Sequence, residues 1–488
     1  MLDLRNYLIH KNVHVYQQGD LNIAYDVNSG SLHVLDEQAF ALLKEIGEIQ
    51  KVGNIELDCQ EEILAQAGTG LSASVKNRIL DEFGELQAQK ILFSPEIAET
   101  EPSYPETPLL KAMCLHVAHD CNLRCRYCFA DTGPFQGKRE LMSAQTGKLA
   151  LDFLLKHCGP RQKCEVDFFG GEPLMNFAVV QELIAYGREK AAAVGKEINF
   201  TLTTNGVLLD EAVADYLEAE GVSVVLSLDG RKEVNDFMRP DVGGRGSYDR
   251  VVPRILNFIA KRPNTSPYAT GQYYYVRGTY THYNLDFYRD VLHMADLGIK
   301  RISVEPVVAP PEADYALREE DIVVLEESYD VLAQKIMEYR ERGQDFSFFH
   351  FNAGLADGPC LPKLLSGCGA GHEYVAIAPN GDIYPCHQFV GQDRFKMGSL
   401  YDFQVKLKKD VVQKFRKAHI YCKEECRSCW ARFSCSGGCH AANNAFGGGL
   451  NRVYDLGCKL QKKRLEVAYY LKIKEALKRE RNKSLLEE

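Results

Sequence analysis

The sequence predicts an α/β protein: an open barrel of six strand–helix repeats, preceded by a small α+β unit and followed by a cysteine-dense region. Three observations support this prediction. Apolar runs alternate with helical periodicity between residues 109 and 314. Polar residues follow these runs, at the strand ends where such folds place their chemistry. Most of the 16 cysteines lie in two clusters, one within the barrel region and one after it.

Residues 1–92 are expected to form the small α+β unit. Alternating residues at 13–16 and 23–27 predict strands, and the turn at 28–30 leads into a third strand at 32–35. Helical periodicity follows after Asp36 and again over residues 74–91. Cys59 is expected to be an inert packing residue. Residues 93–108 are rich in proline, glutamate and threonine, which indicates a linker.

The barrel region covers residues 109–314. Its strands are expected near residues 115–120, 165–171, 199–206, 222–230, 273–281 and 301–308, with helices near 143–157, 177–193, 210–219, 248–261 and 284–296. Helical connections of this length predict parallel strands, and six units make three quarters of an eight-fold barrel. The sequence then predicts a connecting helix at 315–345, a cysteine-dense domain at 346–465 and a charged, solvated helical tail at 466–488.

Composition excludes several classes of function. The chain has 488 residues and a net charge of −9, which argues against nucleic acid as the main partner. No stretch approaches about 18 consecutive apolar residues, so no membrane span is expected. The first residues lack the pattern of a signal peptide. We therefore expect a cytoplasmic protein, in which thiols stay reduced and clustered cysteines serve chemistry.

The strongest local motif lies just after the first barrel strand. Cys121, Cys125 and Cys128 have the spacing C-x3-C-x2-C within one loop. Three close thiolates suit a soft metal or an iron–sulfur cluster. The motif has no fourth ligand within reach, so a four-iron cluster there would keep one iron open to an outside ligand, which is a catalytic arrangement. A structural zinc site with a distant fourth ligand is the alternative.

This motif in a partial (β/α)6 barrel resembles the radical S-adenosylmethionine (radical SAM) enzymes. The resemblance implies that the three cysteines bind a [4Fe-4S] cluster whose open iron binds S-adenosylmethionine. One electron then cleaves this cofactor to methionine and a 5′-deoxyadenosyl radical, which abstracts a hydrogen atom. The cofactor-binding residues implied by the resemblance are Tyr127 near the adenine, Gly170, Gly171 and Glu172 at the amino group, Thr204, Asn205, Ser227 and Asp229 near the ribose and carboxylate, and Arg239 at the carboxylate.

The later cysteines resemble the SPASM domain in number and order. The resemblance implies two auxiliary [4Fe-4S] clusters, and therefore three clusters in the chain. Auxiliary cluster I would take Cys368, Cys386 and Cys439, with Cys360 completing the site or the site left open for a substrate thiolate; cluster II would take Cys426, Cys429, Cys435 and Cys458. A zinc ribbon is the alternative. Cys422 has no clear place, and Cys114, Cys158 and Cys164 are expected to be packing residues.

The N-terminal unit suggests a class of substrate. Radical SAM enzymes with a SPASM domain commonly modify ribosomal peptides, and many carry a winged-helix-like unit that binds a leader peptide as an added strand. Residues 1–92 match such a peptide-recognition unit in size and order, and a small capping domain is the alternative. Residues 113–133, with the segments GRGSYD and YYYVRGTYTHYNLDF, resemble the maturases of six-cysteines-in-forty-five-residues (SCIFF) peptides, which form thioether crosslinks. A Cys-rich precursor peptide, attacked at a Thr, and a reductant such as flavodoxin or ferredoxin are the implied partners.

Two other functions compete with this prediction. Anaerobic sulfatase-maturating enzymes share the barrel and the SPASM domain and make formylglycine. In that branch an Asp follows the cysteine matched by Cys386, whereas this chain has His387, which counts against it. A non-catalytic iron–sulfur electron-transfer protein is the second alternative. The intact Gly170-Gly171-Glu172-Pro173 element and the open three-cysteine site argue for bound S-adenosylmethionine and against that alternative.

Overall fold

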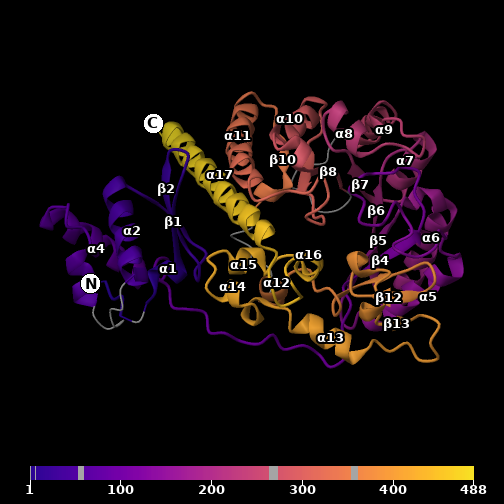
Figure 1. Ribbon diagram of the computed structural model, residues 1–488, viewed down its shortest axis with the longest axis horizontal. Coiled ribbons are helices and arrows are strands. Elements are labelled where there is room, and N and C mark those ends of the chain that lie inside the picture. Colours follow the sequence, from indigo (N-terminus) through magenta and orange to yellow (C-terminus); the bar gives the residue numbers. More distant parts are fainter. Residues whose placement is uncertain (1, 6, 53–59, 263–272, 353–360, 488) are drawn as a thin grey trace.

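The computed structural model describes every residue except 1, 6, 53–59, 263–272, 353–360 and 488. Cys59 and Cys360 therefore lie outside the described residues. The described strands form a three-stranded sheet in residues 1–92 and a ten-stranded sheet that runs through the barrel and the cysteine-dense region. Figure 1 shows the two sheets on either side of the long C-terminal helix.

The N-terminal unit is an antiparallel sheet packed against helices. Its strands are β1 (Val13–Gln18), β2 (Leu21–Asp26) and β3 (Leu32–Leu35), and its helices are α1 (Ile9–Asn12), α2 (Glu37–Val52), α3 (Gln60–Gln66) and α4 (Ala73–Ala88). The turn between β2 and β3 is anchored by Asp26, whose carboxylate accepts from the backbone N–H groups of Asn28 and Ser29 at 3.1 and 2.8 Å. The three predicted strands and the two predicted helices are present. Helices α1 and α3 were not predicted.

The partial barrel is confirmed. Its six parallel strands are β4 (Ala112–Ala118), β5 (Lys163–Gly170), β6 (Glu197–Thr204), β7 (Ser223–Ser227), β8 (Tyr274–Tyr280) and β9 (Arg301–Pro306). The connecting helices are α5 (Ala144–His157), α6 (Phe177–Ala193), α7 (Glu211–Ala219), α8 (Lys232–Met238), α9 (Tyr248–Ala260) and α10 (Tyr288–Asp296). Alternate strand residues such as Val276 and Val304 are buried in the core, which leaves their neighbours facing the barrel lumen.

The barrel sheet extends beyond the predicted domain boundaries. Strand β10 (Ser347–Phe348) pairs with β9 in parallel, although the sequence assigned it to the cysteine-dense domain. At the other edge β11 (Tyr374–Ile377) pairs in parallel with β4, and β12 (Asp382–Tyr384) and β13 (Gly398–Ser399) continue the sheet. An open sheet edge leaves backbone groups unpaired, and these later strands satisfy them. The predicted boundaries at 314 and 346 are therefore wrong for the sheet.

Helices carry the rest of the cysteine-dense region. They are α12 (Leu361–Ser366), α13 (Lys409–Arg416), α14 (Glu424–Arg427), α15 (Arg432–Cys435), α16 (His440–Phe446) and α17 (Asp455–Glu487). The prediction of a solvated tail at 466–488 is wrong for its first part. Helix α17 buries Val467, Leu471 and Ile473, because it packs on the connecting helix α11 (Asp321–Glu341). Residues 476–483 are exposed.

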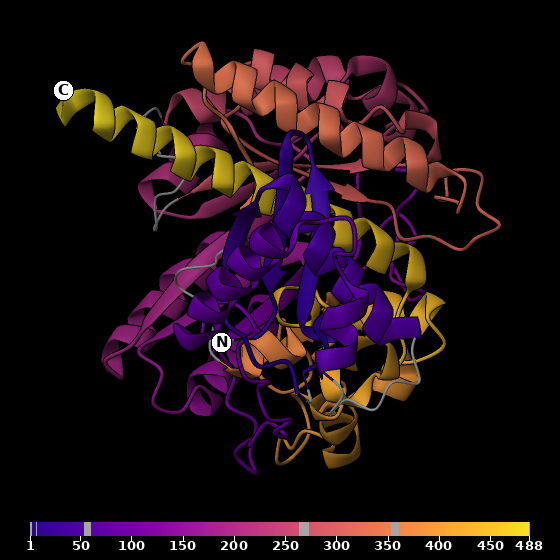
Figure 2. The same cartoon turned by 90° about the vertical axis from the view of Figure 1, so that its left-hand side faces the viewer.

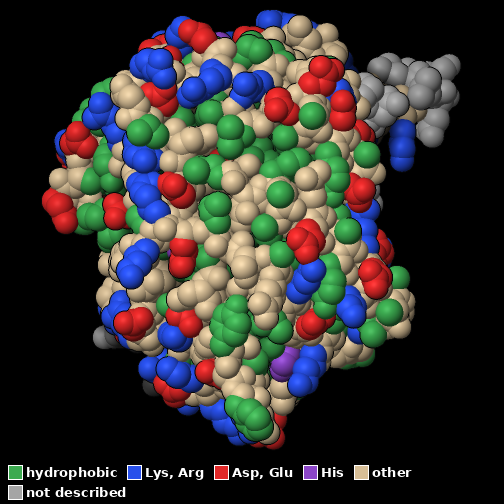
Figure 3. Space-filling model, turned by 90° about the vertical axis from the view of Figure 1, so that its right-hand side faces the viewer, with side chains coloured by type: hydrophobic (Ala, Val, Ile, Leu, Met, Phe, Trp, Pro, Cys, Tyr) green, Lys and Arg blue, Asp and Glu red, His purple; other side chains and the backbone are tan. Residues whose placement is uncertain are grey.

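Helices cover the outer face of the barrel sheet. Figure 2 shows the N-terminal unit lying across α17, and Figure 3 shows the opposite face, where hydrophobic side chains are scattered among polar ones. None of the helices in the described part of the chain is long and apolar enough to cross a membrane. A functional site is therefore expected at the carboxyl ends of the barrel strands, next to the cysteine-dense region.

Candidate active site and cluster sites

Cys121, Cys125 and Cys128, the loop cysteines, follow strand β4 at the carboxyl end of the barrel. Burial raises the pKa of Cys121 to about 12 and that of Cys125 to about 11, and the neighbouring thiols add to both shifts. The loop is fixed from the side by backbone hydrogen bonds from Arg124 to Pro240 (2.7 Å) and from Arg126 to Met238 (2.9 Å). Because Cys121 and Cys125 are neutral thiols in the protein alone, a bound metal centre is what would hold them as thiolates.

Two glycines let the next strand end approach the cysteine loop. Gly170 has a φ of +126°, and a Cβ there would lie 2.2 Å from the carbonyl oxygen of Ala118. A Cβ on Gly171 would lie 2.2 Å from the carbonyl oxygen of Asp120. The N–H groups of Gly171 and Glu172 donate to those same two carbonyls at 2.7 and 2.9 Å. The glycine pair is therefore required for close backbone contact with the cysteine loop.

The Glu172 carboxylate joins two strand ends inside the protein. It is fully buried and accepts from Thr204 Oγ1 and the Asn205 N–H, each at 2.8 Å, and from the Leu174 N–H at 3.0 Å. Burial raises the pKa of Glu172 to about 7. Asn205 in turn lies 3.6 Å from Cys121 Sγ through Nδ2. In the protein alone Glu172 acts as a positioning residue, and its contact with a cofactor amino group stays a prediction.

Tyr127, Asp229 and Arg239 form a second buried network. The Tyr127 hydroxyl donates to Asp229 at 2.8 Å and accepts from Arg239 Nη1 at 2.8 Å. Asp229 also accepts from the Thr279 N–H at 3.0 Å, and burial raises its pKa to about 6. These contacts bring together three of the residues predicted to bind the cofactor. Ser227 is half-buried, and its side chain makes no hydrogen bond to another described residue.

The cysteines of the later region form two groups. Group I contains Cys368, Cys386 and Cys439. Burial is the main cause of the raised pKa of Cys368 and of Cys386; Cys439 adds to the shift of Cys368, and both Cys368 and Cys439 add to that of Cys386. Group II contains Cys426, Cys429, Cys435 and Cys458. Burial raises the pKa of Cys426, Cys435 and Cys458, and neighbouring thiols of the group add to each of these shifts. That these two groups bind the two auxiliary clusters stays a prediction. Among the described residues, no three His, Cys, Asp or Glu side chains are arranged to hold a single metal ion.

The remaining cysteines have different surroundings. Cys114, Cys158 and Cys164 are buried in hydrophobic clusters of the barrel, as expected of packing residues. Cys422 is exposed, and its Sγ lies 3.3 Å from His419 Nε2. The prediction for Cys360 lies outside the described residues.

The lumen contains charged groups to which the sequence analysis gave no role. Arg277 on β8 is exposed and forms no hydrogen bond or ion pair with its side chain among the described residues, and its register partner is Ser227. Its charge acts on Glu305, at the end of β9. Glu305 also lies 3.0 Å from His350 Nε2, while Arg464 of α17 lies 3.3 Å from His350 Nδ1. Only the tertiary fold brings these residues together, so no sequence motif revealed them.

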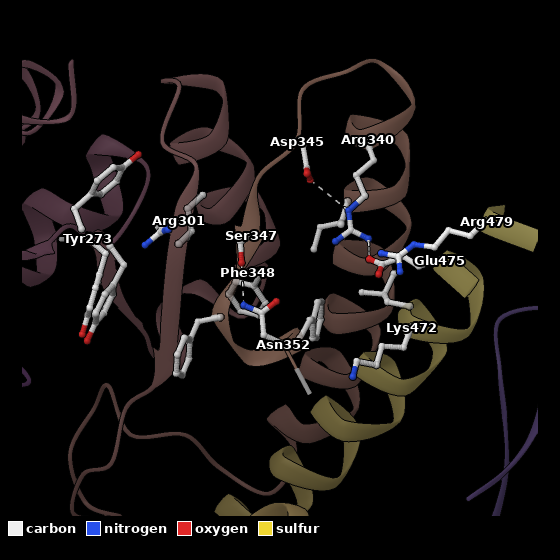
Figure 4. Close-up of a pocket in the computed structure, with 17 residues that line it drawn as sticks. Tyr273, Arg301, Arg340, Asp345, Ser347, Phe348, Asn352, Lys472, Glu475 and Arg479 are labelled. Atoms are coloured by element: carbon white, nitrogen blue, oxygen red, sulfur yellow. Dashed lines mark hydrogen bonds and ion pairs between the residues drawn. The ribbon is translucent and has the colours of Figure 1, made fainter. Parts of the chain in front are cut away.

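A cavity of about 1050 Å³ opens beside the same strands at their amino ends. Figure 4 shows residues from β8, β9, β10, α11 and α17 around it. Tyr275 and Phe349 stack on one wall with ring centroids 6.3 Å apart. On the opposite wall Arg340 pairs with Glu475 and with Asp345 (3.4 Å). The cavity therefore lies between the last barrel strands and the two long helices.

Comparisons with known proteins agree with this architecture. Residues 115–291 match the model of the radical SAM superfamily, and residues 368–430 match SPASM, an iron–sulfur cluster-binding domain. A cysteine-type anaerobic sulfatase-maturating enzyme of Clostridium perfringens (strain 13 / Type A) is 24% identical over 363 residues, covering 69% of this chain and 90% of that protein. A radical SAM cyclopropyl synthase, TigE, of Paramaledivibacter caminithermalis is 21% identical and covers 76% of this chain and 75% of its own length.

Solved structures share the fold. The anaerobic sulfatase-maturating enzyme anSMEcpe with bound AdoMet has a TM-score of 0.60 at 20% identity and covers 75% of this chain and 99% of its own. Streptococcus suis SuiB, bound to precursor peptide SuiA, has a TM-score of 0.50 at 17% identity and covers 92% of this chain and 98% of its own. The fold and the two domain matches show that the chain has a radical SAM α/β fold with a C-terminal SPASM domain.

Proposed function

We propose that this enzyme is a peptide maturase that forms Cys thioether crosslinks in a Cys-rich ribosomal precursor peptide. The observation that carries the proposal is the N-terminal unit, whose sheet has a free edge and which is anchored beside the cysteine-dense region. A reductant such as flavodoxin or ferredoxin would supply the electron that starts each turnover.

The unit is attached to the rest of the molecule through its first strand. His14 on β1 contacts Glu466 of α17 at 2.8 Å and stacks on Trp430, with ring centroids 3.9 Å apart. Trp430 directly follows Cys429 of group II. These contacts hold the sheet in a defined position relative to the auxiliary region. A peptide bound to the sheet would therefore extend from a fixed starting point.

Strand β3 is the free edge of this sheet. The strand order is β1-β2-β3, so β3 pairs only with β2 among the described strands. Its side chains are partly exposed, with Val34 at 46%. An extended leader peptide can pair with such an edge through main-chain hydrogen bonds. Consistent with this proposal, the SuiB chain bound to its precursor peptide covers 92% of this chain, whereas anSMEcpe covers 75%.

The donor set fits the cofactors that the two domains imply. Three loop thiols suit a cluster with one open iron, and groups I and II offer thiols for two more. When bound, the loop cluster and S-adenosylmethionine would supply a 5′-deoxyadenosyl radical that removes a hydrogen atom from the peptide. The hydrogen-bonded network of Tyr127, Asp229 and Arg239 would orient the cofactor at the carboxyl ends of the strands. The lumen cation Arg277 would face the peptide.

The reaction balances as an oxidation of the peptide. One hydrogen atom leaves a carbon, expected in a Thr, and becomes part of 5′-deoxyadenosine. The Cys thiol loses its proton as the carbon–sulfur bond forms, and one electron passes to an auxiliary site. Each crosslink thus removes two hydrogens from the peptide. Each turnover therefore consumes one electron to cleave the cofactor and releases one electron from the peptide.

The test is anaerobic. Protein reconstituted with iron and sulfide is mixed with dithionite, S-adenosylmethionine and a synthetic leader-bearing peptide rich in Cys and Thr. A peptide mass lower by two hydrogens per crosslink, with 5′-deoxyadenosine, is the expected result. The same peptide with Thr replaced by Ala should bind but keep its mass. Crosslinking of that control, or 5′-deoxyadenosine with an unchanged Thr peptide, would contradict the proposal.

The leader contributes a separate test. A peptide without its leader should be modified at a much higher KM, and the leader added as a separate peptide should restore part of the loss. Equal KM values with and without the leader would show that the N-terminal unit has another role. Formylglycine in a sulfatase-derived peptide would instead favour the sulfatase-maturating alternative.

A further inference from the structure

A buried lysine lies between the two auxiliary cysteine groups. Lys423 is fully buried, and its Nζ donates to the carbonyl oxygen of Gly437 at 2.6 Å. Gly437 lies in the short loop that joins Cys435 of group II to Cys439 of group I. The ammonium group therefore reaches into the segment shared by the two proposed cluster sites.

Lys423 is not neutralised by a carboxylate of any described residue. Lys423 forms no ion pair with an acidic residue in the described part of the chain. The groups of opposite potential charge around it are the thiols of Cys426, Cys435, Cys458 and Cys439. An unpaired buried cation is unfavourable, and a cluster ligated by thiolates would supply the missing negative charge.

We propose that Lys423 raises the reduction potentials of the auxiliary clusters, more strongly at group II than at group I. Reduction adds one negative charge to a cluster, and a fixed cation in a low-dielectric interior stabilises that added charge. Lys423 lies directly beside group II, because the Cys426 N–H donates to the Lys423 carbonyl at 3.0 Å, and its ammonium reaches group I only through the loop at Gly437. The loop cysteines lie in the barrel and are not among its partners, so their potential provides an internal reference.

This difference in reduction potential sets the direction of electron transfer between the auxiliary sites. An electron that arrives at group I would pass to group II, leaving group I oxidised and group II reduced, and no proton moves in that step. A one-electron carrier protein would then reoxidise group II. The source of the electron rests on the proposed peptide oxidation, but the effect of Lys423 on the potentials does not.

The test measures potentials of the full-length reconstituted protein by EPR-monitored redox titration. Lys423→Gln and Lys423→Met should both lower the potential of group II, lower that of group I less, and leave the loop cluster unchanged. Lys423→Arg, which keeps the charge, should stay near the wild type. Asn443→Ala is the matched control, because Asn443 Nδ2 donates to the same Gly437 carbonyl at 2.9 Å without charge. It should leave all three potentials in place.

Iron and sulfide content separate an electrostatic effect from misfolding. Unchanged group II potentials in Lys423→Gln, with full iron content, would overturn the inference, as would an equal shift in Asn443→Ala. If the neutral variants lose auxiliary iron and Lys423→Arg retains it, the positive charge stabilises the clusters, which supports an electrostatic role for Lys423. If all three lose iron, packing rather than charge holds the site, and the inference fails. These outcomes do not depend on finding the peptide substrate.

Discussion

The barrel site and the auxiliary region hold their cysteines by different means. In the barrel, the loop cysteines are surrounded by polar side chains that pair with one another, such as Tyr127 with Asp229 and Glu172 with Thr204. In the auxiliary region, turns, short helices and the start of α17 carry the cysteines, and the hydrogen-bond partner of the buried Lys423 ammonium within the described part of the chain is a backbone carbonyl. The comparison suggests that the barrel site is preorganised, whereas the auxiliary region depends on its clusters for charge balance.

Single cysteine substitutions should separate the two regions most sharply. Cys125→Ala is expected to abolish production of 5′-deoxyadenosine, because the loop cluster loses one of three ligands. Cys386→Ala should keep cofactor cleavage without peptide and lose crosslinking. Chromatography of 5′-deoxyadenosine and peptide mass spectrometry measure both. Loss of cofactor cleavage in Cys386→Ala, at full iron content in the loop site, would show that the two regions are not separable.

The next largest effect is expected at the helix that joins the regions. Arg464 on α17 is buried, donates to the Tyr329 hydroxyl at 2.7 Å and lies near Glu305 and His350. Arg464→Ala would leave Glu305 without this cation and should lower the free energy of unfolding by about 3–5 kcal/mol. Denaturant unfolding measures the change. The matched variant Arg479→Ala, on the exposed end of α17, should change it little.

Arg277 is expected to affect substrate rather than stability. Its guanidinium has no direct partner among the described residues, so Arg277→Ala should leave the unfolding midpoint unchanged and raise the peptide KM about tenfold, or ~1.4 kcal/mol. Arg277→Lys should recover part of the loss. Rates of cofactor cleavage without peptide provide the control. A fall in those rates would place Arg277 at the cofactor, next to Ser227, rather than at the peptide.

The smallest effect concerns pH in the cluster-free protein. Burial raises the pKa of Asp229 to about 6 from an ordinary value of 3.8. A raised carboxyl pKa means that the folded state binds the proton more tightly than the unfolded state. The stability from this proton is present below about pH 4 and is lost as the pH rises to about 6. Asp229→Asn should therefore show a shallower fall in unfolding free energy between pH 4 and 7, measured with denaturant. Parallel curves for the two proteins would contradict this.

Much of the barrel could be predicted because its information is local. Apolar periodicity located the six strands, and the helix at 177–193 has the predicted bounds. The spacing of Cys121, Cys125 and Cys128 and the Gly170-Gly171 pair also lie within short segments. Their chemical requirements, a shared loop and close backbone contact, are properties of neighbouring residues.

The sequence by itself determined the order of the units, the strands of the barrel and the cysteine motifs. Only the tertiary structure decided that β10 and β11 extend the barrel sheet, that α17 packs by its first part instead of being solvated, and that Lys423 reaches the loop between two cysteine groups. The reason is physical. Periodicity and spacing report interactions between residues close in the chain, whereas sheet edges, buried charges and helix docking are settled by partners that are distant in it.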